Sequence, residues 1–188
     1  MSALSGTGTH AGAVREESAV AWWRKGDSAH APSEPGSALV DDRADPDALV
    51  PRPVDMDRVK DSLRRLSIRF LTDEDGDALA LWEGHSMLFS LEGPVGNVLV
   101  VRGRADDTVP AEWEARALAS VNEWNRSRRF LRCFLGEPEA DGALPVYADL
   151  HLHLGPGIHD ALLDDLLACL AVVSCSWIDW LHDDGGLL

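Results

Sequence analysis

The chain has 188 residues, of which 45% are hydrophobic, and its 32 Asp and Glu against 17 Lys and Arg give a net charge of −15. This length suits one domain with its own hydrophobic core, which needs neither disulfides nor a metal to fold. The acidic surface repels phosphate backbones and anionic lipids, so it argues against nucleic-acid and membrane-surface partners.

The cysteines and the apolar runs favour a cytoplasmic protein. Three cysteines without metal-type spacing, and no recognisable secretory signal, indicate reduced thiols. The longest apolar run, residues 166–178, falls short of the roughly 20 residues that a membrane span requires. We therefore expect this run to be a buried helix.

Residues 1–53 predict a tail that is mostly disordered, because Gly, Ser, Pro and Asp recur there with few large apolar residues. Within this tail, residues 14–25 are a candidate short helix that carries Trp22 and Trp23 near its end. Two roles are open for the tryptophan pair. It could dock on the chain's own domain, or it could anchor another protein, since large aromatic side chains supply much of the contact energy at small interfaces.

Residues 54–184 predict one α+β domain that opens with a helix over residues 55–66, where apolar residues recur at helical spacing. Short strands follow at residues 68–71, 78–82, 85–91 and 97–104, with turns between them. Residues 98–101 are apolar on both sides. This predicts a central strand whose two faces are covered, either within the domain or by a second subunit.

The second half of the domain predicts two more helices around two strands. Thr108 as a cap and Pro110 in a first turn indicate a helix over residues 109–127. Its predicted apolar stripe consists of Trp113, Ala117, Val121 and Trp124, with Leu118 beside it. Strands are predicted at residues 130–135 and 144–154, and a last helix at residues 158–181 with an apolar stripe too wide for one contact surface. The order α-β-β-β-β-α-β-β-α predicts an antiparallel sheet with flanking helices.

Asn122 and Asn125 are unusual inside a helix, because asparagine is a poor helix former. Their spacing of three residues predicts that they lie side by side. We expect their amides to satisfy backbone groups of the adjoining strand or turn, and the alternative is a pair of amides that faces a ligand or partner. With Trp124 between them, they form a candidate partner-binding or structural motif.

A dense group of arginines surrounds the end of the same helix, and comprises Arg116, Arg126, Arg128, Arg129 and Arg132. Because the second half of the chain is acidic, we interpret this group as internal charge balance or as half of a contact between identical subunits.

The best metal-like pattern is Asp149, His151 and His153, which alternate onto one face of a predicted strand. A further ligand would have to come from elsewhere, and His85 and His159 are candidates only by residue type. We favour ordinary paired or solvated side chains here. No nucleophile elbow and no phosphate-binding glycine motif occurs in the sequence, so we predict no catalytic, cofactor-binding or metal residue and no enzyme activity.

Several short stretches resemble the YbjN family, namely residues 99–104, the helix around Asn122 and Asn125, Phe130, Val146 with Tyr147, and the long helix after residues 157–160. The resemblance covers about residues 54–181. It implies a fold similar to type III secretion chaperones, no known catalytic residues and no cofactor. The family is regarded as bacterial regulators of sensory transduction.

From these observations we expect a non-enzymatic, regulatory or chaperone-like module that binds a protein or peptide, with a role in bacterial stress or signalling. A homodimer is a further expectation. Two alternatives remain at this point: a metal-binding hydrolase or sensor that uses Asp149, His151 and His153, and a domain that serves only for oligomerisation.

Overall fold

The computed structural model describes residues 50–188, and these residues form one sheet with helices packed against it. The expected helix at residues 14–25, with Trp22 and Trp23, lies outside the described residues. Three α-helices, a short 3-10 helix and six strands are described: α2 (Met56–Arg65), β1 (Phe70–Thr72), β2 (Ala78–Trp82), β3 (His85–Glu92), β4 (Val98–Val109), η3 (Ala111–Trp113), α3 (Glu114–Ser127), β5 (Arg132–Leu135), β6 (Leu144–His153) and α4 (Asp160–His182). The predicted α+β class and element order are confirmed.

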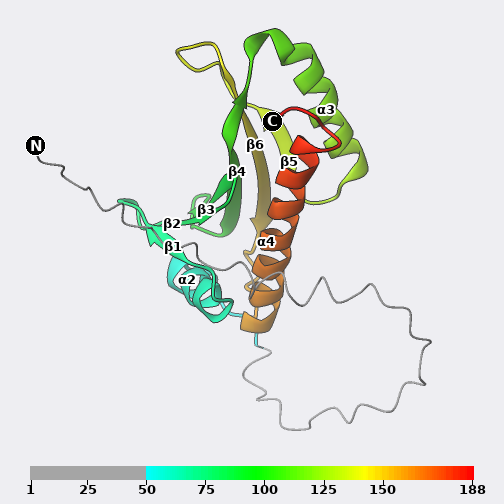
Figure 1. Ribbon diagram of the computed structural model, residues 1–188. Helices are drawn as coiled ribbons and strands as arrows, with labels where there is room; N and C mark the ends of the chain where they lie inside the picture. The colour runs from blue at the N-terminus through cyan, green and yellow to red at the C-terminus, as the bar shows by residue number, and fades with distance from the viewer. Residues whose placement is uncertain (1–49) are drawn as a thin grey trace, which may run out of the picture.

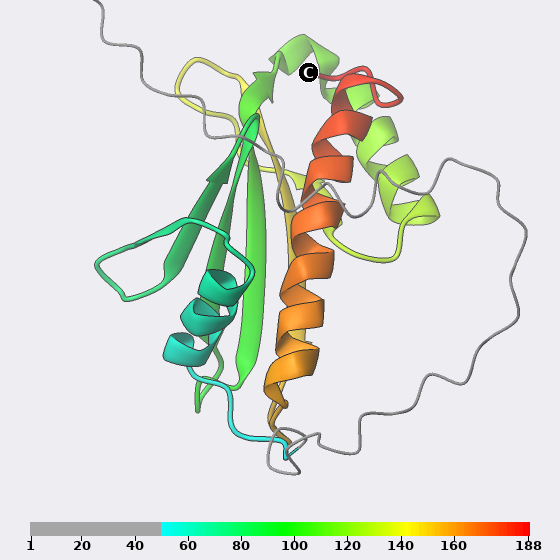
Figure 2. The same ribbon diagram turned by 60° about the horizontal axis from the view of Figure 1, so that its bottom comes forward.

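All six strands are antiparallel, in the order β1-β2-β3-β4-β6-β5. β4 lies in the middle of the sheet, as the apolar residues 98–101 predicted. The helices cover one face of the sheet, with α4 running along its length (Figures 1 and 2). Alternate side chains of the strands point to the helices, so the core lies between the two layers.

The core is built around the tryptophans of two helices. Trp177 of α4 and Trp124 of α3 are both almost completely buried. Gly103 of β4 leaves room for Trp177, because a Cβ atom at Gly103 would lie 3.1 Å from the Trp177 ring and 2.8 Å from the Met87 sulfur. β4 therefore has no side chain at the point where Trp177 packs.

The largest boundary difference from the prediction lies between β4 and α3, and β5 begins at Arg132 instead of residue 130, which leaves Phe130 in a loop. Thr108 does not cap a helix, because β4 continues to Val109 and pairs with β6 through Thr108 and Pro145 after an irregularity in the register. α3 consequently begins at Glu114, and Trp113 lies in the 3-10 turn before it. The predicted stripe is wrong at Trp113 and Leu118, which are 39% and 45% exposed, and right at Ala117, Val121 and Trp124.

Residues at the start of the described chain join the beginning of α4. The backbones of Arg52 and Ile158 exchange two hydrogen bonds, of 2.9 and 3.2 Å. The Arg58 guanidinium donates to the Ile158 carbonyl at 2.7 Å and to Asp160 at 2.6 Å. One helical turn further along α4, Asp164 accepts from Arg65 at 2.6 Å. α2 and α4 are thus joined by ion pairs at their exposed side.

Candidate protein-interaction site

The long helix α4 buries one side and exposes apolar side chains on another. Its buried side packs in the core through Leu163, Leu167, Leu170, Trp177 and Leu181. By length and composition alone α4 would be able to cross a membrane, yet only 39% of its most apolar 18-residue stretch is buried. The rest of the helix is partly buried or exposed, and its exposed apolar side chains are Ala161, Leu162 and Cys169.

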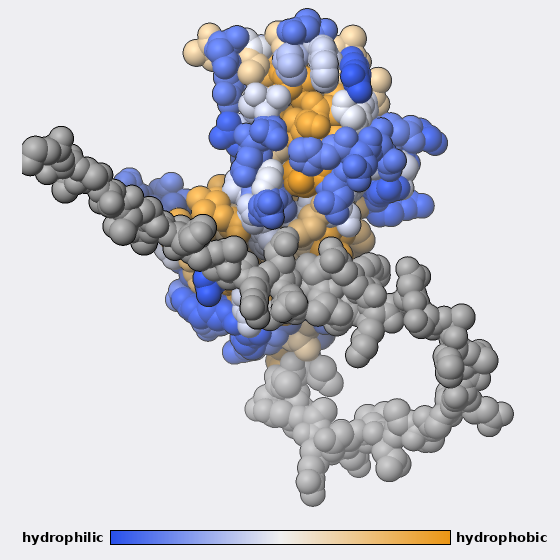
Figure 3. Space-filling model, viewed as in Figure 1, coloured by the Kyte–Doolittle hydropathy of each residue, from blue (hydrophilic) through white to orange (hydrophobic). Residues whose placement is uncertain are grey.

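The exposed apolar side chains of α4 lie on the flank that faces away from α2. Leu162 is 50% exposed, Leu166 and Val173 are half-buried, and Cys169 is exposed between them. Their spacing of three and four residues places them in one row along the helix. Figure 3 shows hydrophobic surface toward the C-terminal end of α4, beyond the part of the helix that carries Leu162 and Leu166.

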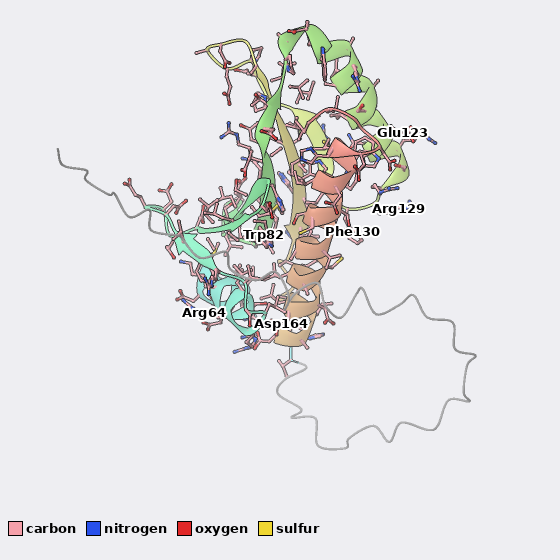
Figure 4. All side chains as sticks on the ribbon, in the orientation of Figure 1. Arg64, Trp82, Glu123, Arg129, Phe130 and Asp164 are labelled. Carbon is pink, nitrogen blue, oxygen red and sulfur yellow. The ribbon has the colours of Figure 1, made fainter. Side chains whose placement is uncertain are left out.

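The loop of residues 128–131, between α3 and β5, runs beside the middle of α4 in both ribbon views (Figures 1 and 2). Phe130 in this loop is 44% exposed. Arg129 is exposed and forms no ion pair within residues 50–188. Figure 4 shows Phe130 nearer to α4 and Arg129 farther out. We call Leu162, Leu166, Cys169, Val173 and this loop the α4 face.

The loop is held by α3 at three points. The Trp124 indole donates to the Leu131 carbonyl at 2.7 Å, and Leu131 adopts a left-handed backbone with φ of 57°. The Arg128 guanidinium lies 5.4 Å from the centre of the Trp124 ring, a distance typical of a cation–π contact. A buried leucine with positive φ is uncommon, so these contacts fix a strained turn that presents Phe130 to solvent.

Asn125 makes the third contact. Its amide nitrogen donates to the Cys133 carbonyl at 2.8 Å, and its amide oxygen accepts from the Cys133 N–H at 2.8 Å. This two-point contact joins α3 to the outer edge of β5. The prediction that the amide satisfies the backbone of the adjoining strand is therefore right for Asn125. It is wrong for Asn122, which is exposed and makes no side-chain hydrogen bond within the described chain.

The predicted arginine group is divided among local contacts. Arg126 pairs with Glu123 at 2.7 Å on the surface of α3, and this contact lowers the pKa of Glu123 through its hydrogen bond. Arg116 lies over the Trp113 ring at 4.8 Å. Arg132 is exposed on the sheet face opposite the helices, so the five side chains do not form one surface. Of the five arginines, Arg128 and Arg129 belong to the loop and therefore to the α4 face.

His85 and Ser174 form a buried pair that sequence reasoning did not find. The His85 Nε2 atom lies 3.0 Å from the Ser174 hydroxyl, which itself donates to the Ala171 carbonyl at 2.9 Å. Because the Ser174 hydroxyl donates to the Ala171 carbonyl, its oxygen is available to accept from an N–H at His85 Nε2. Nδ1 has no hydrogen-bond partner among the described residues.

Burial lowers the pKa of His85, while the Glu83 backbone and the charges of Asp106 and Asp179 partly offset this effect. The ring stacks on Trp82 with 5.3 Å between centroids. His85 is 1% exposed and Ser174 is fully buried, so no substrate can reach them. We interpret the pair as part of the packing between β3 and α4.

The metal-like residues lie on the exposed face of β6 but contact different partners. His151 lies 3.3 Å from Asp149, whereas His153 lies 3.2 Å from the Asn97 amide. His85 is buried in the core, and His159 caps α4 by accepting from the Leu162 N–H at 3.2 Å. Among residues 50–188, no group of three or more His, Cys, Asp or Glu side chains is placed to hold a metal ion. The metal alternative has no geometric support.

Comparison with known proteins decides the family. Residues 55–183 match the model of the YbjN family, which is described as a putative bacterial sensory transduction regulator. The chain belongs to the YbjN family. No curated protein matches the chain in sequence.

A crystal structure of YbjN from E. coli, described as a putative transcription regulator, has a similar fold. The TM-score is 0.54 at 13% identity, over 63% of this chain and 84% of that one. At this identity the similarity establishes the YbjN fold and no more.

Within this YbjN domain, the α4 face could have been located only in part from the sequence. The predicted stripe of the last helix was too wide for one contact surface, and the core leaves Leu162 exposed and covers Leu166 only in part. The sequence predicts Phe130 as the first residue of a strand, whereas the structure places it, 44% exposed, in the loop before β5.

Proposed function

We propose that this YbjN-family domain is a non-enzymatic, regulatory protein-interaction module that binds a partner segment on the α4 face. The observation that carries the proposal is the exposure of Leu162 and Cys169 on α4 and of Phe130 in the loop, with the half-buried Leu166 and Val173 in the same row. Exposure of apolar side chains to water is unfavourable, and a contiguous exposed apolar surface marks an interaction site. Phe130 is a suitable anchor, since buried aromatic side chains contribute strongly to binding.

The charges beside this face indicate the chemistry of the partner. The molecule is acidic overall, but Arg128 and Arg129 form a local basic border beside the apolar row. Carboxylates of a partner would gain from these guanidinium groups, while a basic partner would be repelled there. We therefore expect a segment that carries apolar side chains followed or preceded by Asp or Glu.

Among residues 50–188, the candidate reactive side chains are not assembled into an open reaction centre, which supports the non-enzymatic part of the proposal. The buried His85 and Ser174 are closed to solvent. Asp149 and His151 pair with each other, and His153 pairs with Asn97. None of these groups is arranged as an acid, base and nucleophile around an open site.

The test compares two exposed apolar positions on opposite faces of the domain. A photoreactive phenylalanine analogue replaces either Phe130 on the α4 face or Leu81 on β2, which is 62% exposed on the sheet face away from the helices. After irradiation of cells that contain the full chain, we expect adducts with another protein from position 130 and far fewer from position 81. The crosslinked segment should contain apolar and acidic residues.

Arg129→Glu should reduce the adduct from position 130, because it reverses the charge that attracts the partner. Equal labelling from positions 130 and 81, or no adduct from position 130, would contradict the proposal. Adducts formed only with a second copy of the chain would instead favour the oligomerisation alternative.

A further inference from the structure

We propose that residues 14–25 of the same chain are a second occupant of the α4 face and cover it when no partner is bound. This inference rests on the proposed function, because it describes how access to the same site is regulated. Docking of Trp22 and Trp23 on the chain's own domain would then use the same surface that a partner binds.

The first argument is the place where the chain enters the domain. The two hydrogen bonds between Arg52 and Ile158 fix the entry point beside the first turn of α4. From Lys25 to Val50 there are 24 intervening residues, 26–49, which reach at most about 80 Å. α4 has 23 residues and is about 35 Å long. Every point of the α4 face is therefore within reach of residues 14–25.

The second argument is charge complementarity along the face. Near its N-terminus α4 exposes Asp165, which forms no ion pair within residues 50–188, whereas Asp160 and Asp164 are engaged by arginines. Beside the middle of α4 lie Arg128 and Arg129. Asp165 thus lies between Leu162 and Leu166 at the N-terminal end of the face, and the basic side chains lie in the loop.

Residues 14–25 carry the reverse order when they are followed back from the entry point. Arg24 and Lys25 come first, then the apolar residues 19–23, and then Glu17, Glu16 and Arg15, which together carry a net charge of −1. If the segment lies antiparallel to α4, its basic end meets Asp165 and its acidic end meets the loop.

Tethering makes even a weak contact effective. A connection of this length gives an effective concentration of about 1 mM, so an intrinsic dissociation constant of about 0.1 mM leaves the face about 90% occupied. The exposed Cys169 thiol would then react with a maleimide about tenfold more slowly than in a chain lacking residues 1–25.

Disulfide trapping to the native Cys169 tests the contact in the full chain. Ala19→Cys places a thiol three and four residues from the two tryptophans, and Ser33→Cys places one between the segment and the domain. Tethering alone favours Ser33→Cys, because 17 residues separate it from Val50 against 31 for Ala19→Cys; the rates would differ by a factor of about 2.5. Docking predicts the opposite order: at micromolar protein, Ala19→Cys should form its disulfide with Cys169 about tenfold faster than Ser33→Cys does.

Variants identify the contact that is responsible. Trp22→Ala with Trp23→Ala should abolish the advantage of Ala19→Cys, and Glu16→Lys with Glu17→Lys should reduce it. Asp41→Lys with Asp42→Lys is the matched control, since it makes the same charge change outside the segment. Faster closure by Ser33→Cys would overturn the inference. So would disulfides mainly between two chains, because a second copy would then be the occupant.

The outcome for the proposed function is read separately. Removal of residues 1–25 should raise the yield of partner adducts from position 130 several-fold. If trapping fails while these adducts persist at the same yield, residues 14–25 do not cover the face and the proposed function stands. If Ala19→Cys closes rapidly and no partner adduct appears with or without residues 1–25, the docking stands and the proposed function fails.

Discussion

Replacement of Asn125 by alanine should weaken the domain far more than the same change at Asn122. Asn125 makes two hydrogen bonds of 2.8 Å to the backbone of Cys133, a residue that is 1% exposed. Each such bond contributes about 1 kcal/mol net, and a buried backbone group left without a partner costs about 1–3 kcal/mol. Water can reach this edge in part, so we expect Asn125→Ala to lower the free energy of unfolding by about 2–4 kcal/mol.

Urea unfolding of both variants, followed by circular dichroism and tryptophan fluorescence, measures the difference. With an m value of about 2 kcal/mol per molar urea, Asn125→Ala should move the midpoint down by about 1–2 M. Asn122→Ala is the control from the same helix, one turn away, and its effect should stay within about 0.5 kcal/mol because this exposed side chain, unlike that of Asn125, makes no hydrogen bond within residues 50–188.

A third variant separates the two hydrogen bonds. Asn125→Asp keeps an acceptor for the Cys133 N–H but loses the donor to the Cys133 carbonyl. Its cost should be no less than that of one lost hydrogen bond. Equal midpoints for Asn125→Ala and Asn122→Ala, with m unchanged, would refute the reasoning, because the contact would then contribute nothing to stability.

Three further predictions concern buried or paired groups. Asp164→Ala removes the acceptor of the buried Ser62 hydroxyl and of Arg65, and should lower the free energy of unfolding, measured in urea, by about 1–3 kcal/mol. The control Asp165→Ala changes an exposed residue and should be nearly neutral. Similar free energies of unfolding for the two variants would contradict this prediction. Burial lowers the pKa of His85, so its contribution to the free energy of unfolding is fully present above the pKa of the unfolded histidine, about 6.5. This contribution is lost as the pH falls through the lower folded pKa. Urea unfolding between pH 5 and 8 should therefore show a shallower pH dependence for His85→Phe, and an unchanged slope would argue against it. Burial raises the pKa of Cys133 to about 11, so mass spectrometry after alkylation at pH 8 should find Cys169 modified well before Cys133, and equal rates in the folded protein would show that the core opens locally.

The element order followed from local patterns. Helical spacing in residues 55–66 and 158–181, and alternation in residues 144–154, are properties of single elements, and the structure contains each of these elements. Thr108 shows where local patterns fail. A threonine two residues before a proline also suits a helix cap. Only the pairing of Thr108 with Pro145, 37 positions away, extends β4 past Thr108.

The site was less accessible from sequence for the same reason. An asparagine inside a helix indicated that its amide needs a partner, but the partner of Asn125 is set by the path of residues 128–133. The contact between His85 and Ser174 joins residues 89 positions apart, and no motif predicts it. The α4 face follows from which part of a wide apolar stripe the sheet leaves uncovered, and that depends on packing.

The amide of Asn125 also has a consequence for the behaviour of the protein at high concentration. A sheet edge with unpaired backbone groups can recruit strands from other molecules and start aggregation. The outermost strands here have only three and four residues, and one of them already bonds to a side chain at Cys133. Loss of the amide would uncover a strand edge in a weakened domain, so Asn125→Ala should precipitate at lower concentration than other variants of equal stability.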